Sequence, residues 1–245
     1  MVEPTYRTLE ILARFLVLAS GTRITYAGEQ NVPERGGAVI AINHTSYVDW
    51  LPAALAMHRR HRRLRFMIKA EMQQRRVVNF LIERTKAIPV DRHAGSGAYA
   101  VAVRRLREGE LVGVYPEATI SRSFELKEFK SGAARMAAEA GVPIVPVIVW
   151  GSQRIWTKGQ PRHLMGWPGR NEVTVAVGAP LPASASMAGL RESMTTMLHC
   201  AQEQYPHPAG AYWVPQRLGG GAPTLTEATA LDAEEAAGRR QRRSG

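Results

Sequence analysis

Seven short apolar runs recur between residues 24 and 177, and they are the feature that most restricts the fold of this chain. Several are β-branched and apolar throughout, which is typical of strands buried on both faces of a sheet. Segments with helical periodicity separate them, and this alternation predicts an α/β fold with a mostly parallel or mixed sheet. The expected strands are residues 24–27, 38–42, 64–68, 87–90, 111–115, 144–150 and 172–177.

The helical segments complete a single layered domain in which helices flank about seven strands. We expect these helices near residues 47–58, 71–83, 97–108, 131–140 and 186–204. The domain boundaries are an N-terminal amphipathic helix over 1–21, the folded domain over 22–205 and a flexible tail over 206–245. Proline, a run of three glycines and a basic terminus predict the tail, within which residues 226–237 are a candidate for one short acidic helix.

The N-terminal helix has an uncharged apolar run over residues 15–19, with Glu10 and Arg14 before it. This run is far shorter than the roughly 20 residues that span a bilayer. Two interpretations stay open: a helix lying in the plane of a membrane surface, or an ordinary amphipathic helix that closes the domain.

Composition excludes several classes of protein. A hydrophobic fraction of 45% argues against wholesale disorder, and a single cysteine, Cys200, excludes a disulfide scaffold. The chain has three aspartates and neither Cys-x-x-Cys nor His-Glu-x-x-His, so we expect no metal site.

The net charge of +11 predicts an anionic partner, which would be nucleic acid, a membrane surface or a phosphorylated substrate. A general bias toward arginine, which supplies 27 of the 32 basic residues, is the alternative. Residues 58–65 hold five arginines. This cluster is either a docking site for membrane or phosphate or a solvated helix end.

Polar residues follow two of the predicted strands, where α/β proteins place their sites. His44 and Asp49 lie five residues apart after the strand over 38–42, so the carboxylate can orient the imidazole as a general base. The alternative is a capping box with Ser46 at the N-cap and Asp49 at N3. After the strand over 111–115, Glu117 and Arg122 lie in a loop rich in donors suited to a phosphate.

Two further segments carry weaker patterns. Residues 95–100 fit the dinucleotide pattern G-x-G-x-x-A, but four residues separate them from the preceding strand, which favours a flexible loop with Ser96 as an N-cap. Pro143 and Pro146 interrupt the apolar run over 142–147, which predicts an edge or irregular strand.

Four segments together resemble the glycerolipid acyltransferase superfamily, which includes the lysophosphatidic acid and glycerol-3-phosphate acyltransferases. Residues 43–49 (NHTSYVD) are similar to the block N-H-x-x-x-x-D, and 88–92 (IPVDR) to the block F-I-D-R. Residues 115–119 (YPEAT) resemble F-P-E-G-T, and 142–147 resemble the closing V-P-I-x-P-V block. The likeness extends over residues 22–180 in the order found in the family.

The resemblance implies that His44 is the base and that Asp49 orients it. It implies that the acceptor site contains Arg92, which holds the phosphate, and the residues Glu117, Ala118 and Thr119. The donor is then acyl-CoA or acyl carrier protein, the acceptor is a lysophospholipid, and no cofactor, metal or nucleic acid is expected. The enzyme would act peripherally on the anionic cytoplasmic face of the cell membrane.

The third block departs from the family pattern P-E-G-T-R-S. Ala118 stands at the glycine position and Ile120 at the arginine position, so Arg122 becomes the candidate for the missing cation. Two other functions remain as alternatives: a non-catalytic basic module that binds lipid or nucleic acid, and an NAD(P)-binding oxidoreductase.

Overall fold

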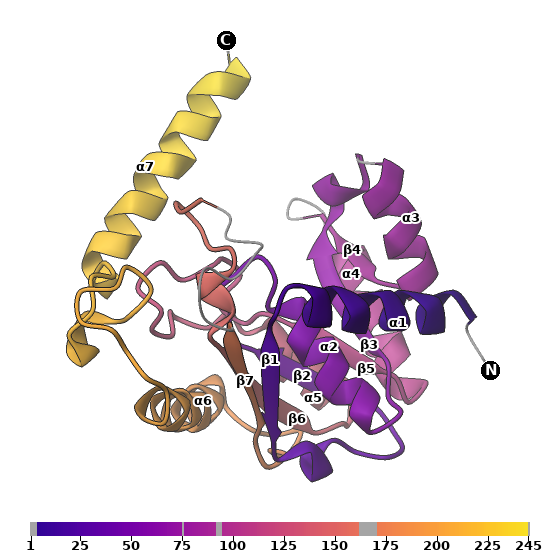
Figure 1. Ribbon diagram of the computed structural model, residues 1–245. Coiled ribbons are helices and arrows are strands. Elements are labelled where there is room, and N and C mark those ends of the chain that lie inside the picture. The colour runs from indigo at the N-terminus through magenta and orange to yellow at the C-terminus, as the bar shows by residue number, and fades with distance from the viewer. Residues whose placement is uncertain (1–3, 75, 92–94, 162–170, 245) are drawn as a thin grey trace.

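One seven-stranded sheet organises the protein (Figure 1). The computed structural model describes residues 4–74, 76–91, 95–161 and 171–244. In this part of the chain the strand order is β1-β7-β6-β2-β5-β3-β4, and all neighbours are parallel except β6 and β7. The strands are β1 (Arg23–Ala27), β2 (Ala38–Ile42), β3 (Leu64–Lys69), β4 (Ile88–Val90), β5 (Leu111–Val114), β6 (Ile144–Trp150) and β7 (Glu172–Val177). The predicted single α/β domain with a mixed sheet of about seven strands is confirmed.

Helices connect the strands and cover the sheet. The α-helices of the described chain are α1 (Pro4–Ala19), α2 (Trp50–Arg59), α3 (Arg76–Thr85), α4 (Gly95–Arg107), α5 (Gly132–Ala140), α6 (Met187–Glu203) and α7 (Leu225–Ser244). Short 3₁₀ turns are η1 (Glu29–Asn31), η2 (Ala70–Gln74), η3 (Ser152–Arg154) and η4 (Gln216–Leu218).

Alternate residues of β2 belong to two separate hydrophobic cores. Val39 and Ala41 lie in the core that α4, α5 and α6 cover. Ala38, Ile40 and Ile42 lie in the core on the other face, with α2. Every residue of β2 is therefore buried, which explains why this strand is apolar throughout rather than alternating.

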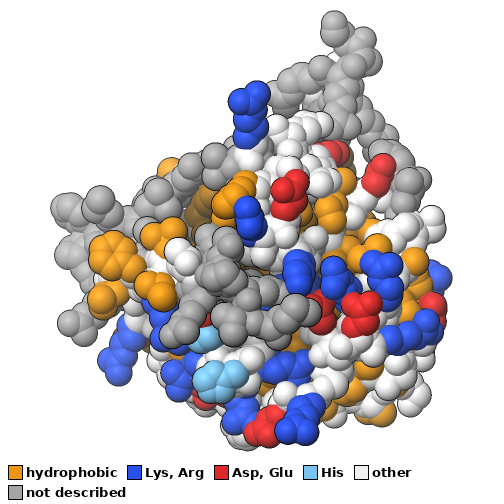
Figure 2. Space-filling view, turned by 90° about the vertical axis from the view of Figure 1, so that its right-hand side faces the viewer, with side chains coloured by type: hydrophobic (Ala, Val, Ile, Leu, Met, Phe, Trp, Pro, Cys, Tyr) orange, Lys and Arg blue, Asp and Glu red, His pale blue; other side chains and the backbone are white. Residues whose placement is uncertain are grey.

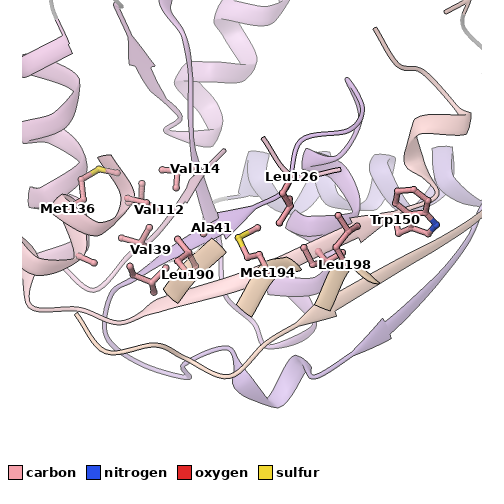
Figure 3. Close-up of a cluster of buried hydrophobic side chains, with 14 of the residues drawn as sticks. Val39, Ala41, Val112, Val114, Leu126, Met136, Trp150, Leu190, Met194 and Leu198 are labelled. Atoms are coloured by element: carbon pink, nitrogen blue, oxygen red, sulfur yellow. The ribbon is translucent and has the colours of Figure 1, made fainter. Parts of the chain in front are cut away.

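The larger core lies between the sheet and α4, α5 and α6. Figure 3 shows Leu190, Met194 and Leu198 of α6 beside side chains of β2, β5 and β6. Their spacing of four residues places all three on one face of the helix. This packing fixes α6 against β6, the strand beside β2.

Proline occurs inside a central strand, which corrects the expectation of an edge or irregular strand over 142–147. Pro146 belongs to β6, which lies between β7 and β2. The antiparallel ladder with β7 begins only at Val147, and the Pro146 carbonyl accepts a hydrogen bond from Gly178 N–H at 2.9 Å. Because no carbonyl of β7 pairs at this position, the missing N–H of proline interrupts no ladder.

Residues 206–224 pack against the domain, although the sequence predicts a tail after Tyr205. Trp213, Val214 and Ala222 belong to the larger core, and Trp213 is only 7% exposed. These three apolar residues lie among prolines and glycines, so no periodicity marks them in the sequence. The structure thus extends the folded region beyond the expected boundary, while the mobility of this segment stays a prediction.

The first helix presents apolar side chains to solvent. Ile11, Leu12, Phe15 and Leu18 of α1 are 51–78% exposed. Among the helices that the structure describes, none is both long and apolar enough to cross a membrane.

We predict that Trp213→Ala lowers the free energy of unfolding by about 3–5 kcal/mol, because it removes a large buried side chain. Phe80→Ala, at an exposed position of α3, is the matched control and should cost less than about 1 kcal/mol. Urea unfolding of both variants measures the difference. Equal effects would show that residues 206–224 do not pack on the domain.

Candidate active site

The carboxyl ends of β2 and β5 lie side by side and define the site. Ala41 of β2 pairs with Val114 of β5, so the loops that begin at residues 43 and 115 leave the sheet together. β6 runs parallel to β2 on its other side and extends past it. Three loops from distant parts of the sequence therefore meet at one edge of the sheet, where α/β proteins place their sites.

A buried carboxylate orients the candidate base. Asp49 Oδ2 lies 3.2 Å from His44 Nδ1 and accepts hydrogen bonds from the backbone N–H groups of Thr45 and Ser46, each at 2.8 Å. Ser152 Oγ donates to the other oxygen, Oδ1. Asp49 is fully buried, so these donors compensate the loss of water around its charge.

The predicted capping box is not the N-cap of α2: this helix has Asp49 itself at the N-cap, without a side-chain cap hydrogen bond. Ser46 Oγ accepts from Val48 N–H at 3.0 Å and Asp49 accepts from Ser46 N–H, which resembles a capping box but lies in the turn before the helix. The helix begins at Trp50, three residues later than predicted, because the loop residues bind Asp49 instead of continuing the helix.

One ring nitrogen of His44, Nδ1, faces Asp49, and the other, Nε2, is the candidate proton acceptor. In the tautomer whose Nδ1 carries a proton toward Asp49, Nε2 keeps a lone pair. The ring stacks on Tyr115, with centroids 4.0 Å apart and planes at 22°, and its side chain is 20% exposed. This arrangement is suited to removing a proton from a hydroxyl group.

Glu117 joins the loops that follow β2 and β5. Its Oε1 accepts from His44 N–H at 2.8 Å and its Oε2 accepts from Lys127 N–H at 3.0 Å. Burial raises the pKa of Glu117 to about 7, although the two backbone hydrogen bonds act in the opposite direction. The carboxyl group thus fixes the backbone of His44 and is close to half-protonated near neutral pH.

The residue that replaces the family glycine adopts a glycine-like conformation. Ala118 has φ +59°, in the left-handed region, and closes a turn by donating its N–H to Tyr115 O at 3.0 Å. Ile120, at the family's arginine position, is buried. The side chain of Thr119 accepts a hydrogen bond from Lys127 Nζ at 2.8 Å.

Two residues predicted to bind phosphate have different outcomes. Arg92 lies outside the described residues. Arg122 lies in the loop after β5, and its guanidinium binds Asp232 at 3.2 Å and Glu235 at 2.8 Å. Both carboxylates belong to α7, which the sequence did not connect with the site.

Sequence reasoning missed two polar residues that hold the site together. Asn43 is fully buried; its side chain accepts from Val149 N–H at 2.7 Å and donates to Val149 O at 3.0 Å. These bonds tie the end of β2 to β6, immediately before His44. Ser152, which binds Asp49, follows β6, and no sequence pattern connects it with the base.

The arginine cluster over residues 58–65 lies at the opposite edge of the sheet. It surrounds the beginning of β3, whose first residue, Leu64, pairs with Leu111 at the beginning of β5. Its side chains bind partners within the protein: Arg59 binds Glu29, Arg60 binds Glu34, Arg62 binds the carbonyls of Pro33, Gly36 and Gly109, and Arg65 binds Glu110 and the carbonyl of Thr85.

These contacts show that the arginine cluster also holds the fold together, and its docking function stays a prediction. The face in Figure 2 likewise has acidic side chains beside Lys and Arg.

Residues 95–100 form neither a dinucleotide-binding turn nor the expected flexible loop, because α4 begins at Gly95 and Ser96 lies inside it rather than at its N-cap. Gly95 and Gly97 lie in the first turn of α4 rather than in a tight turn before it. The preceding strand, β4, is at the edge of the sheet, whereas dinucleotides bind where the strand order reverses inside it. No group of three His, Cys, Asp or Glu side chains in the described parts of the chain could hold a metal ion.

We predict that Glu117 makes stability depend on pH. Because its folded pKa is raised to about 7 from 4.5, the folded state retains a proton between these values that the unfolded chain releases. The free energy of unfolding therefore falls as pH rises through this range, by about 3 kcal/mol for a shift of this size. Urea unfolding of the wild type and of Glu117→Gln between pH 4.5 and about 7 measures this decline. The same dependence of the free energy of unfolding on pH in both proteins would contradict the prediction.

We predict that Ala118→Gly stabilises the protein by about 0.5–1 kcal/mol. Glycine removes the left-handed strain of about 1–2 kcal/mol, and greater freedom of the unfolded chain offsets part of the gain. Ala138→Gly, at an exposed position of α5, is the matched control and should destabilise by about 1 kcal/mol. Thermal unfolding distinguishes stabilisation from destabilisation. Destabilisation by both substitutions would show that the backbone of Ala118 is not strained.

Comparison with known proteins identifies the family. A family model described as Acyltransferase matches residues 23–150. A 1-acyl-sn-glycerol-3-phosphate acyltransferase of Bacillus subtilis (strain 168) is 27% identical over 183 residues, which cover 73% of this chain and 87% of the relative. A protein of the same name from Borreliella burgdorferi is 28% identical over 144 residues, which cover 57% of this chain and 56% of that relative.

A solved structure has the same fold. The crystal structure of the 1-acyl-sn-glycerophosphate (LPA) acyltransferase PlsC from Thermotoga maritima matches with a TM-score of 0.68 at 20% identity. The match covers 82% of this chain and 81% of that one. The family match includes both loops that carry the His44, Asp49 and Glu117 site, and the chain therefore belongs to the acyltransferase family.

Proposed function

We propose that this enzyme transfers a fatty acyl group from an acyl thioester to the free hydroxyl of lysophosphatidic acid, which gives phosphatidic acid. The observation that carries the proposal is the His44–Asp49 pair, whose available Nε2 lies at the edge of the sheet where the three loops meet. The names of the relatives from Bacillus subtilis and Borreliella burgdorferi support the choice of acceptor.

In this mechanism His44 acts first as a base and then as an acid. Its Nε2 takes the proton of the acceptor hydroxyl as the oxygen attacks the carbonyl carbon of the thioester. Asp49 stabilises the imidazolium that forms, because its charge faces Nδ1. The tetrahedral intermediate then breaks its carbon–sulfur bond, and the imidazolium returns the proton to the departing thiolate. The products are phosphatidic acid and a free thiol.

No covalent acyl-enzyme takes part in this sequence. Cys200, on the exposed surface of α6, has no role in it. The donor is acyl-CoA or acyl carrier protein, and both present the same thioester to the base. No metal or other cofactor enters any step.

The acceptor site contains the loop after β5. Glu117 holds this loop against the backbone of His44, and Thr119 lies on it. Arg122 replaces the family's arginine as a cation for the phosphate, because Ile120 is buried and uncharged. Arg92 supplies a second cation in this proposal, and Ala118 forms the turn that directs the loop toward the site.

A membrane surface is the source of the acceptor in this proposal. The exposed apolar side chains of α1, from Ile11 to Leu18, suit a helix that lies in the interface of a bilayer. The association is peripheral and on the cytoplasmic face of the cell membrane. It uses the apolar face of α1 rather than the arginine cluster.

We predict that His44→Ala lowers kcat for thiol release by about 10²–10⁴-fold, because the general base is lost. The assay follows release of CoA from acyl-CoA with lysophosphatidic acid in mixed vesicles. His199→Ala, on the surface of α6, is the matched control and should keep full activity. Undiminished release by a folded His44→Ala protein would contradict the role of His44.

A further inference from the structure

Three basic side chains converge next to the proposed acceptor site. Arg122 and Lys127 lie in the loop after β5, and Lys158 lies in the loop after η3. All three are only 14–21% exposed, and two of the five lysines of the chain are among them. We call these three residues the cation cluster.

Two carboxylates of α7 bind the entire cluster. Asp232 Oδ1 lies 2.6 Å from Lys158 Nζ and 3.2 Å from Arg122 Nε, and Oδ2 lies 2.6 Å from Lys127 Nζ. Glu235 Oε2 lies 2.8 Å from both Arg122 Nη2 and Lys158 Nζ. Three like charges converge stably only when an anion lies between them, and in this structure α7 provides it.

Short hydrogen-bonded connections link the cluster to the base. Lys127 donates its backbone N–H to Glu117, whose other oxygen binds the backbone of His44. Thr157, which precedes Lys158, donates its hydroxyl to Thr45 O at 2.7 Å. The cation cluster therefore belongs to the same framework of loops as His44.

The loop of Lys158 lies close to Arg122 at Gly159. Gly159 has φ +79°, and a Cβ at this position would lie 2.4 Å from Arg122 Nη1. The left-handed backbone favours glycine here, and a Cβ would displace the end of the Arg122 side chain. Lys127 is held in addition by Thr119.

The attachment of α7 at this point depends on charge. Its apolar side chains Leu225 and Leu231 are about two-fifths exposed, and Ala228 is buried. Burial opposes the charge of Asp232, but hydrogen bonds from Lys127 and Lys158 outweigh it and lower the pKa of Asp232. Figure 1 shows that the C-terminal end of α7 projects away from the domain.

The two carboxylates carry the same charge as the group that the acceptor would bring. A phosphate monoester has a charge of about −1.5 to −2 at neutral pH. In lysophosphatidic acid the phosphate is borne on the carbon next to the one that carries the reacting hydroxyl. Its binding site must therefore lie close to the base, as the cation cluster does.

We propose that Lys127 and Lys158, together with Arg122, bind the phosphate of the acceptor, and that Asp232 and Glu235 fill this site until the acceptor displaces them. This inference rests on the proposed function. The last helix then acts as an internal competitor of the acceptor. Apparent affinity scales with the fraction of molecules whose site is open, so removing the competitor must tighten acceptor binding.

The kinetic test uses the full chain with both carboxylates neutralised, Asp232→Asn with Glu235→Gln. We expect the KM for lysophosphatidic acid to fall roughly three- to tenfold, with the KM for acyl-CoA unchanged. Glu234→Gln removes an exposed charge from the same helix and should leave both values unchanged. An unchanged or raised acceptor KM in the double variant would overturn the competition.

The lysines are tested in the background of that double variant. Lys127→Gln or Lys158→Gln should raise the acceptor KM about tenfold there, with a smaller effect on kcat. If the lysines served only to hold α7, their substitution would have no effect once the carboxylates are neutral. That result would overturn their assignment to the phosphate.

A binding readout separates this inference from the proposed function. Hydrogen exchange of residues 226–238 should accelerate when inorganic phosphate or lysophosphatidic acid is added, and should not change with monoacylglycerol. Acceleration without acyl transfer would leave the anion site standing while the proposed function fails. Acyl transfer with unchanged exchange and unchanged KM values would overturn the anion site and leave the proposed function standing.

Discussion

The buried carboxylate of Asp49 is the interaction on which the site depends. It accepts hydrogen bonds from the loop after β2 and from Ser152 after β6, and it faces Nδ1 of His44, the candidate base. A charge with no exposure to water is stable only with such a set of donors. One group therefore orients His44, orders the loop before α2 and links the ends of two strands, so the geometry of the candidate site and the local fold have a single cause.

The sequence predicts the strands of the sheet well, because a strand buried on both faces is apolar throughout. Each expected strand, such as 38–42 or 144–150, agrees with the structure within one residue at either end. His44, Asp49 and Glu117 are predictable for a related reason: polar residues at the carboxyl ends of buried strands meet at one edge. The strand order is not predictable in this way, since the apolar pattern of β5 does not reveal its neighbours.

The missed features all depend on contacts between residues far apart in the chain. Arg122 and Asp232 are 110 residues apart, and Asn43 and Val149 are 106 apart. Amphipathic periodicity reports burial but not partners, so α7 is visible in the sequence only as an acidic helix. Trp213 shows the same limit, because a single buried aromatic residue among prolines and glycines has no period to reveal it.

Net charge is a poor guide to partners here because the two edges of the sheet use cations differently. At the amino edge, Arg62 donates to three carbonyls, a task suited to a planar group with several fixed donors. At the carboxyl edge, Lys127 and Lys158 present compact ammonium groups on flexible stems, which can exchange one anion for another without rebuilding a planar geometry. The arginines at the first edge therefore stabilise the fold, and the two lysines beside Arg122 at the second suit the exchange of anions that we propose.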